Sequence, residues 1–227
     1  MIILNTRSLI STIDALNEAV LRRLPWEDEA ERLSAWLADR LGKPGGYAGS
    51  FALTEGDWNR EFRLFTGERI TTKVARAHII AEEAIRALAI IHRVTGRECP
   101  ALTESAASLA DRIFHHEGST VVQDGIYCCG RCSAAFWRCM AAGGYGPQQQ
   151  TLSQGLSSLA RHRDGHGGWR RFPFYYTLAL LGEIDPGLAA AEIRYCSPRF
   201  SDLRRLLVRK TDRYSFRRLQ IINRLAV

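Results

Sequence analysis

The sequence predicts an all-α protein in which helical hairpins close into a small ring, an α/α toroid. Two observations predict this fold class. First, one pattern, a polar turn followed by a nearly all-apolar helix, occurs twice between residues 124 and 184. Second, a helix that is apolar almost all round has to be enclosed by other helices. This favours a closed ring over an open solenoid, whose concave face is wet.

The two copies of the pattern have the same order of parts. The first copy has the turn 124–130, Asp-Gly-Ile-Tyr-Cys-Cys-Gly, and the helix 132–142. The second has the turn 164–169, Asp-Gly-His-Gly-Gly-Trp, and the helix 174–184. The Asp-Gly step permits positive φ at the glycine, and the aromatic residue that follows folds back under the helix start. An amphipathic helix precedes each turn, so the repeat is an outer helix, a turn and an inner helix.

Apolar residues spaced by three and four predict helices in the N-terminal half. These helices cover 7–24, 27–41 and 71–94, separated by Pro25-Trp26 and by the glycine-rich segment 42–70. Three acidic residues open the second helix, where they suit the positive end of the helix dipole. The third helix begins at a threonine cap, Thr71 or Thr72, and stops at Gly96.

The C-terminal half is predicted to be helical almost to its end. Its helices begin at Pro100 and after Pro147, and later ones cover 186–195, 200–210 and 212–225. The chain carries a net charge of +7, and the tail 194–227 holds ten Lys or Arg against two Asp. We expect this basic amphipathic tail to pack its apolar face on the ring with its guanidinium groups outward. A chain of 227 residues suits one substantial core, so 1–227 is interpreted as a single domain.

The segment 148–185, and less closely 103–143, resembles the repeats of protein prenyltransferase β-subunits and of squalene and terpenoid cyclases. The most specific match is the turn 164–169 followed by Tyr-Thr-Leu-Ala-Leu-Leu at 176–181. The resemblance implies a central apolar cavity, lined by inner helices and suited to isoprenoid-like molecules. The chain has fewer hairpins than a full toroid of that family, so the ring is reduced or closes through its terminal helices.

The catalytic motifs of that family are not matched. The Asp-x-Asp-Asp cluster with which the cyclases protonate their substrate is absent from the sequence. The positions that correspond to the zinc ligands of the prenyltransferases are occupied by Arg131, Ser133 and Tyr176. If the chain is an enzyme, the resemblance implies a transferase or a cyclase/lyase.

Four of the six cysteines lie within twelve positions, at 128, 129, 132 and 139. Cys129 and Cys132 form a Cys-x-x-Cys at a helix start, whose positive end lowers the pKa of a thiol. Cys128, Cys129, Cys132 and His166 are candidate zinc ligands, because lanthionine-synthetase cyclases, also α/α toroids, place Cys, Cys and His ligands near inner-helix ends. The alternatives are a redox or nucleophilic thiol and, as the preferred interpretation, buried structural cysteines without a cofactor. The candidate catalytic residues are Asp124, Cys129, Cys132 and His166.

The other polar candidates are expected to be structural. His78, His92 and the pair His115-His116 are expected to cap helices or to face solvent. Glu82-Glu83 is expected on a solvated helix face. The sequence contains no P-loop, dinucleotide-binding fingerprint or Gly-x-Ser-x-Gly elbow.

These observations favour a protein that binds or transforms a hydrophobic, isoprenoid-like small molecule. We expect its cavity to be lined by Trp58, Phe136, Trp137, Tyr175 and Tyr176. The alternative is a non-catalytic binding or scaffold protein that docks a partner protein through the basic C-terminal surface. Nucleic acid is a less favoured partner, because no aromatic single-strand platform or DNA-binding motif accompanies the charge.

The cysteine content favours a cytoplasmic location. Six cysteines in 227 residues are far fewer than a disulfide scaffold needs, and their clustering is typical of a reducing compartment. Apolar runs are too short to span a bilayer, and the first four residues are too short for the apolar part of a signal peptide. Any membrane contact is therefore expected to be peripheral.

Overall fold

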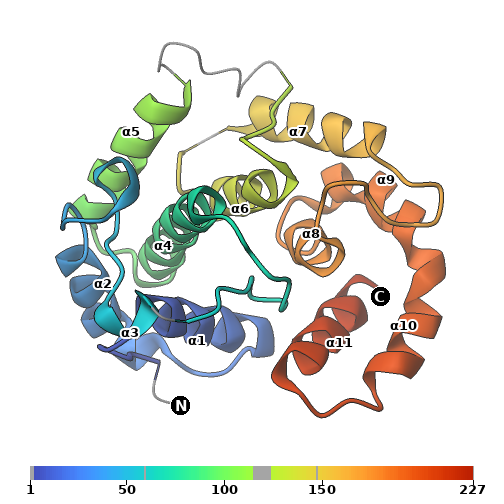
Figure 1. The fold of residues 1–227 in the computed structure, drawn as a ribbon, viewed down its shortest axis with the longest axis horizontal. Coiled ribbons are helices and arrows are strands. Elements are labelled where there is room, and N and C mark those ends of the chain that lie inside the picture. The colour runs from blue at the N-terminus through green and yellow to red at the C-terminus, as the bar shows by residue number, and fades with distance from the viewer. Residues whose placement is uncertain (1–2, 59, 115–123, 147, 227) are drawn as a thin grey trace.

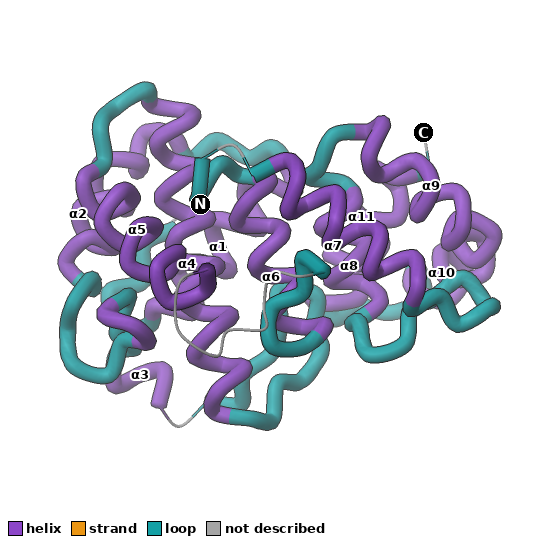
Figure 2. Tube along the Cα trace, turned by 90° about the horizontal axis from the view of Figure 1, so that it is seen from above, coloured by secondary structure: helices purple, strands orange, loops and turns teal. Residues whose placement is uncertain are grey.

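Figure 1 shows the computed structural model, which describes residues 3–58, 60–114, 124–146 and 148–226. Regular secondary structure in these residues is helical, as the sequence predicts, and the view at right angles shows helices throughout (Figure 2). The N-terminal half contains α1 (Leu9–Arg22), α2 (Ala30–Asp39), α3 (Glu55–Trp58), α4 (Lys73–Thr95) and α5 (Pro100–Phe114). The C-terminal half contains α6 (Gly130–Ala141), α7 (Gln149–Arg161), α8 (Phe174–Leu181), α9 (Pro186–Cys196), α10 (Phe200–Leu207) and α11 (Arg213–Leu225). Short 3₁₀ helices cover Glu27–Glu29, Tyr47–Gly49 and Ser197–Arg199.

Helices α4, α6 and α8 lie at the centre of the molecule, with α5, α7 and α9 outside them (Figure 1). Each outer helix packs on the inner helix that precedes it, and α6 contacts both α4 and α8. Burial follows this arrangement, since four of 15 residues are buried in α5 but ten of 12 in α6. The corresponding numbers are six of 13 in α7 and six of eight in α8. The predicted order of elements, an outer amphipathic helix, a turn and an inner apolar helix, is therefore present in α5–α6 and in α7–α8.

The long helix α4 forms the middle of the core. Every residue from His78 to Ile91 is buried, and α4 contacts α1, α2, α5 and α6. Both predicted ends are confirmed. Thr72 Oγ1 accepts a hydrogen bond from the Ala75 N–H at 3.3 Å, and Gly96 ends the helix with φ of +66°.

Two glycines allow the first polar turn to pack closely. Gly125 has φ of +68°, and a Cβ at this position would lie 2.4 Å from the backbone nitrogen of Gly155 in α7. A Cβ on Gly155 would in turn lie 2.4 Å from the indole ring of Trp137. That indole Nε1–H donates to the carbonyl oxygen of Gly125 at 2.7 Å. The turn, α6 and α7 thus fit together with no room for a larger side chain.

The C-terminal helix α11 brings the two ends of the chain together by packing on α1 and α8. Its Arg217 is buried and pairs with Asp14 at 3.1 Å and with Glu18 at 2.8 Å. The expectation that the guanidinium groups of the tail face outward is wrong for this residue. A buried arginine is stable where carboxylates and carbonyl groups accept its donated hydrogen bonds. Among the described residues, no helix has the length and apolar character needed to cross a membrane.

Candidate metal centre and the adjoining pocket

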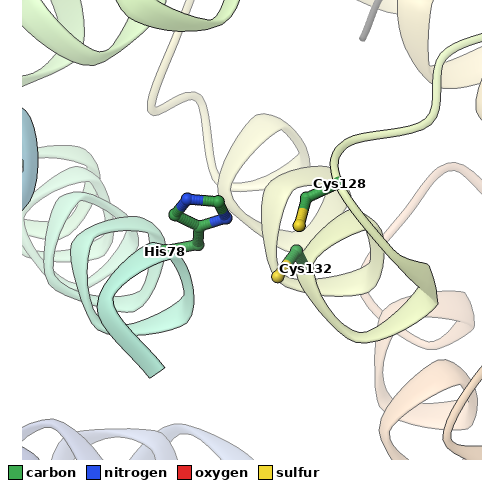
Figure 3. Close-up of side chains that lie close together, drawn as sticks. All are labelled: His78, Cys128 and Cys132. Carbon is green, nitrogen blue, oxygen red and sulfur yellow. The ribbon is translucent and has the colours of Figure 1, made fainter. Parts of the chain in front are cut away.

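Three side chains that can bind metal meet where the start of α6 faces α4. They are His78, Cys128 and Cys132, and one potential ligand atom of each lies within 4.8 Å of the other two. Figure 3 shows the imidazole of His78 directed from α4 toward the two cysteines. We call this group the His78 cluster.

The fold fixes His78 from both sides. Its ring lies 4.5 Å from that of Tyr47 and 4.7 Å from that of Tyr127, measured between ring centroids. Burial, aided by the charge of Arg112, lowers the pKa of His78 to about 4. The imidazole is therefore neutral at pH 7, which is the form that binds metal. Among the described residues, its buried Nδ1 has no hydrogen-bond partner.

The cysteines differ in exposure and in acidity. Cys128 is exposed and has φ of +57°, whereas Cys132 is fully buried in the first turn of α6. Between them, Cys129 precedes α6 as its N-cap, and its Sγ lies 3.6 Å from that of Cys132. The Cys132 thiol and the backbone N–H groups of Cys132 and Arg131 lower the pKa of Cys129 to about 5, against the effect of burial. The predicted acidic thiol at the helix start is thus located at Cys129.

The donor set of the His78 cluster fits zinc. Imidazole nitrogen and thiolate sulfur are preferred zinc ligands, and tetrahedral coordination places them about 3.5 to 3.8 Å apart. Because the ligand atoms lie within 4.8 Å of one another, metal binding requires them to approach by at most about 1 Å. The exposed side chain of Cys128 has the freedom to make this adjustment.

The structure places His78 with the cysteines, whereas two of the candidate site residues, His166 and Asp124, lie elsewhere. His166 is exposed in the second polar turn, where its backbone N–H donates to Asp164 Oδ1 at 2.7 Å. Asp124 is exposed and pairs with Arg161 of α7 at 3.1 Å. His78 was expected to be a capping or solvated residue, and that expectation is wrong because the residue is buried. His115 and His116 lie outside the described residues.

The residues expected around a cavity are distributed over different parts of the core. Phe136 packs between Phe114, Tyr127 and Tyr145, as the ring contacts show. Trp137 is fully buried against the first polar turn, as described above. Tyr175 lies on the guanidinium of Arg218, Tyr176 donates its hydroxyl to Glu83, and Trp58 is 56% exposed.

Charged side chains from α4, from α6 and from the residues just after α8 meet at the centre. Arg138 donates to Glu83 at 2.5 Å and to Glu183 at 2.7 and 2.9 Å, and Arg86 donates to Glu183 at 2.8 Å. Burial raises the pKa of Glu83, but Arg138 and Arg86 outweigh it, so the pKa lies below its ordinary value. We call these four residues the central charge network. A signal for it is visible in the sequence, since arginine and glutamate interrupt otherwise apolar helices.

Glu82 is buried, and none of the described residues supplies a cationic partner for it. Burial raises its pKa to about 8, so the carboxyl group is mostly protonated at pH 7. Its Oε2 accepts a hydrogen bond from the hydroxyl of Tyr145 at 2.8 Å. The expectation that Glu82-Glu83 lies on a solvated face is wrong, because both side chains face the interior of the helical assembly.

A pocket of about 440 Å³ lies between the segment 45–58 and the start of α4. Its volume is in the range of small-molecule sites. Tyr47 both lines this pocket and packs on His78, so it forms the wall between the pocket and the His78 cluster. The pocket is lined by Gly45, Tyr47, Phe51, Leu53, Trp58, Lys73, Arg76, Ala77 and Ile80. Of the residues expected around a cavity, Trp58 is the one found here.

Comparison with protein-family models, with curated proteins and with solved structures gives no match for this chain. The resemblance of residues 164–169 and 176–181 to prenyltransferase and cyclase repeats therefore stays a prediction.

Proposed function

We propose that this chain is a zinc-binding protein that holds an apolar, isoprenoid-like molecule in the pocket beside the zinc site. The observation that carries the proposal is the position of Tyr47. Its side chain lines the 440 Å³ pocket, and its ring centroid lies 4.5 Å from that of His78. A ligand in the pocket would thus be separated from a metal ligand by a single aromatic ring.

Zinc at the His78 cluster would have three protein ligands. Sites of this kind keep a fourth position for water or substrate, whereas structural zinc sites have four protein ligands. A group bound at that fourth position would be polarised by the zinc or activated as a nucleophile. The exposure of Cys128 gives solvent access to this side of the cluster. We assign the activity to the transferase or cyclase/lyase class on this basis and on the sequence resemblance.

The proposal includes an α/α-toroid arrangement. It is supported by the alternation of inner helices α4, α6 and α8 with outer helices α5, α7 and α9 (Figure 1). It is also supported by the contact between α1 and α11, because terminal helices that touch are what a ring with few hairpins needs.

Metal analysis tests the zinc site. Protein purified under reducing conditions without chelator, then dialysed after exposure to zinc, should hold about one zinc per chain. His78→Ala and Cys132→Ser should each reduce this to well below one. Cys196→Ser is the matched control, because Cys196 is a buried thiol of α9 outside the cluster. Zinc that persists in Cys132→Ser, or wild-type protein without zinc, would contradict the proposal and support purely structural cysteines.

Ligand binding tests the pocket. Geraniol, a neutral isoprenoid alcohol, should bind and quench tryptophan fluorescence, and Trp58→Phe should abolish most of the quenching. Trp26→Phe is the control, since Trp26 is buried and is not among the residues that line the pocket. Equal quenching in wild type and Trp58→Phe would show that any geraniol binds elsewhere.

A second candidate function is favoured by the central charge network. Its charged side chains occupy the meeting point of the inner helices, where the sequence resemblance placed a cavity. In this alternative the helices are a platform, and the basic C-terminal surface docks an acidic partner protein. Arg209 and Lys210 are exposed there beside the exposed side chains of Leu206 and Val208. Absence of both zinc and geraniol binding would favour this alternative.

A further inference from the structure

The 440 Å³ pocket combines apolar walls with cationic side chains at one end. Phe51 and Ile80 are buried in its walls, and Trp58 lies across Gly45, where a Cβ would be 3.7 Å from the indole ring. Lys73 and Arg76 also line the pocket, and both belong to the first turn of α4. The pocket therefore offers an apolar interior and a positively charged end.

Within the part of the chain that the structure describes, neither cation has an acidic partner. None of the described residues that line the pocket is acidic, and the first turn of α4 contains no acidic residue. Lys73 is exposed and forms no salt bridge with the described residues. The positive end of the 23-residue helix α4 adds to the potential at this point.

Arg76 is held in place while part of its hydrogen-bonding capacity is unused. Its Nη2 donates to the backbone carbonyl oxygen of Asp57, and its guanidinium lies 5.7 Å from the ring centroid of Phe62. Its Nε is buried and has no partner among the described residues. An anionic ligand in the pocket would add charge-assisted hydrogen bonds to this guanidinium. The carboxylate of Asp57 does not compete for it, because it accepts from Ser8, Leu9 and Thr54.

We infer that the pocket binds an amphiphile with one anionic head group, which Lys73 and Arg76 hold while the apolar body lies against Phe51, Ile80 and Trp58. This inference rests on the proposed function and adds the charge of the ligand to it. A carboxylate and a phosphate monoester share the chemistry that these cations recognise. Geraniol, the neutral alcohol, has no anionic group for these cations to bind.

Calorimetric titration with three ligands of the same carbon skeleton tests the inference. Geranate should bind wild-type protein about fivefold or more tightly than geraniol, as expected for a partly exposed ion pair. The preference should shrink as salt is added. Geranyl phosphate is the third ligand. If it binds more tightly than geranate, the natural head group is a phosphate, and if more weakly, a carboxylate.

Two substitutions at the exposed lysine separate charge from shape. Lys73→Met should remove most of the preference for geranate over geraniol, and Lys73→Arg should keep it. Arg93→Met is the matched control, because Arg93 is an exposed cation in the last turn of the same helix. Equal affinity of wild type for geranate and geraniol would overturn the inference while leaving the proposed function intact. Failure of all three ligands to bind would overturn both.

Discussion

Replacing Arg138 by methionine should destabilise the protein strongly, because the residue holds the central charge network together. Its side chain is 1% exposed and contacts both carboxylates of the network. The two arginines and two glutamates of the network sum to zero charge. Arg138→Met leaves a net charge of −1 in the core, with Arg86 as the remaining cation.

The loss of stability in Arg138→Met depends on how far solvent can reach the carboxylates that Arg138 contacts. Glu83 has a side chain that is 9% exposed, so its carboxylate cannot regain the hydration that the arginine replaced. Removing one partner of a buried ion pair costs about 3 to 5 kcal/mol, whereas an exposed pair contributes about 0 to 1 kcal/mol. Arg97→Met is the matched control, since Arg97 is 66% exposed and pairs with the exposed Glu31 at 3.0 Å.

Urea unfolding at pH 7 and pH 5 measures how much stability Arg138→Met loses and whether the buried charge of Glu83 causes the loss. In wild type the pKa of Glu83 is depressed, so its contribution to stability is present above the ordinary pKa and is lost as the pH falls through the folded-state pKa. Without Arg138 that pKa should rise, because burial is the largest influence on it and Arg86 is the remaining cation. The deficit of Arg138→Met relative to wild type should therefore be smaller at pH 5 than at pH 7.

A double variant separates the buried charge from lost packing. Glu83→Gln in the Arg138→Met background restores a net charge of zero, so it should recover a large part of the lost stability. A cost of Arg138→Met no greater than that of Arg97→Met would refute the reasoning. So would a deficit that does not change between pH 5 and pH 7.

Three further predictions concern other parts of the chain. Trp169→Ala should cost about 3 to 5 kcal/mol, because Trp169 is buried and donates its indole N–H to Glu192 at 2.7 Å. An unchanged melting temperature would contradict the packing role of the second polar turn. Glu82→Gln should raise the free energy of unfolding by an amount that grows as the pH rises from 5 to 8, because the unfolded wild type ionises there while the folded carboxyl stays protonated. A pH-independent effect in chemical unfolding would contradict this. In a mobility-shift assay, duplex DNA of random sequence should bind weakly and should be released at physiological salt concentration. Binding that resists salt and depends on the DNA sequence would show that the tail 194–227 is a nucleic-acid site.

Helix positions were largely predictable because they depend on local pattern. The apolar residues of α4 recur over six turns, and Thr72 and Gly96 mark its ends through interactions with their own backbone. The same holds for α11, where Asp212 accepts from the N–H groups of Tyr214 and Ser215. Capping needs only neighbours in sequence, so no knowledge of the tertiary structure was required.

The candidate site was only half predictable. The Cys-x-x-Cys at the start of α6 and the low pKa of its first thiol follow from a helix terminus, which the sequence marks. His78 lies 50 residues before Cys128, and its place opposite the cysteines depends on how α4 packs on α6. The pocket also depends on the tertiary structure, because Trp58 and Lys73 line it together although an irregular segment separates them in the chain.

The helical class, the ends of the long helices and the order of outer and inner helices in each hairpin could all be predicted before the structure was known. These features follow from hydrophobic periodicity and from caps that act over a few residues. Which polar residues are buried depends on how the helices pack. Glu83 is buried because Arg138 and Arg86 compensate its charge from α6 and α4, and Arg217 because α1 supplies Asp14 and Glu18. Apart from Arg86, which lies one turn from Glu83 on α4, these partners are far apart in the chain, so the compensation is complete only when the helices pack.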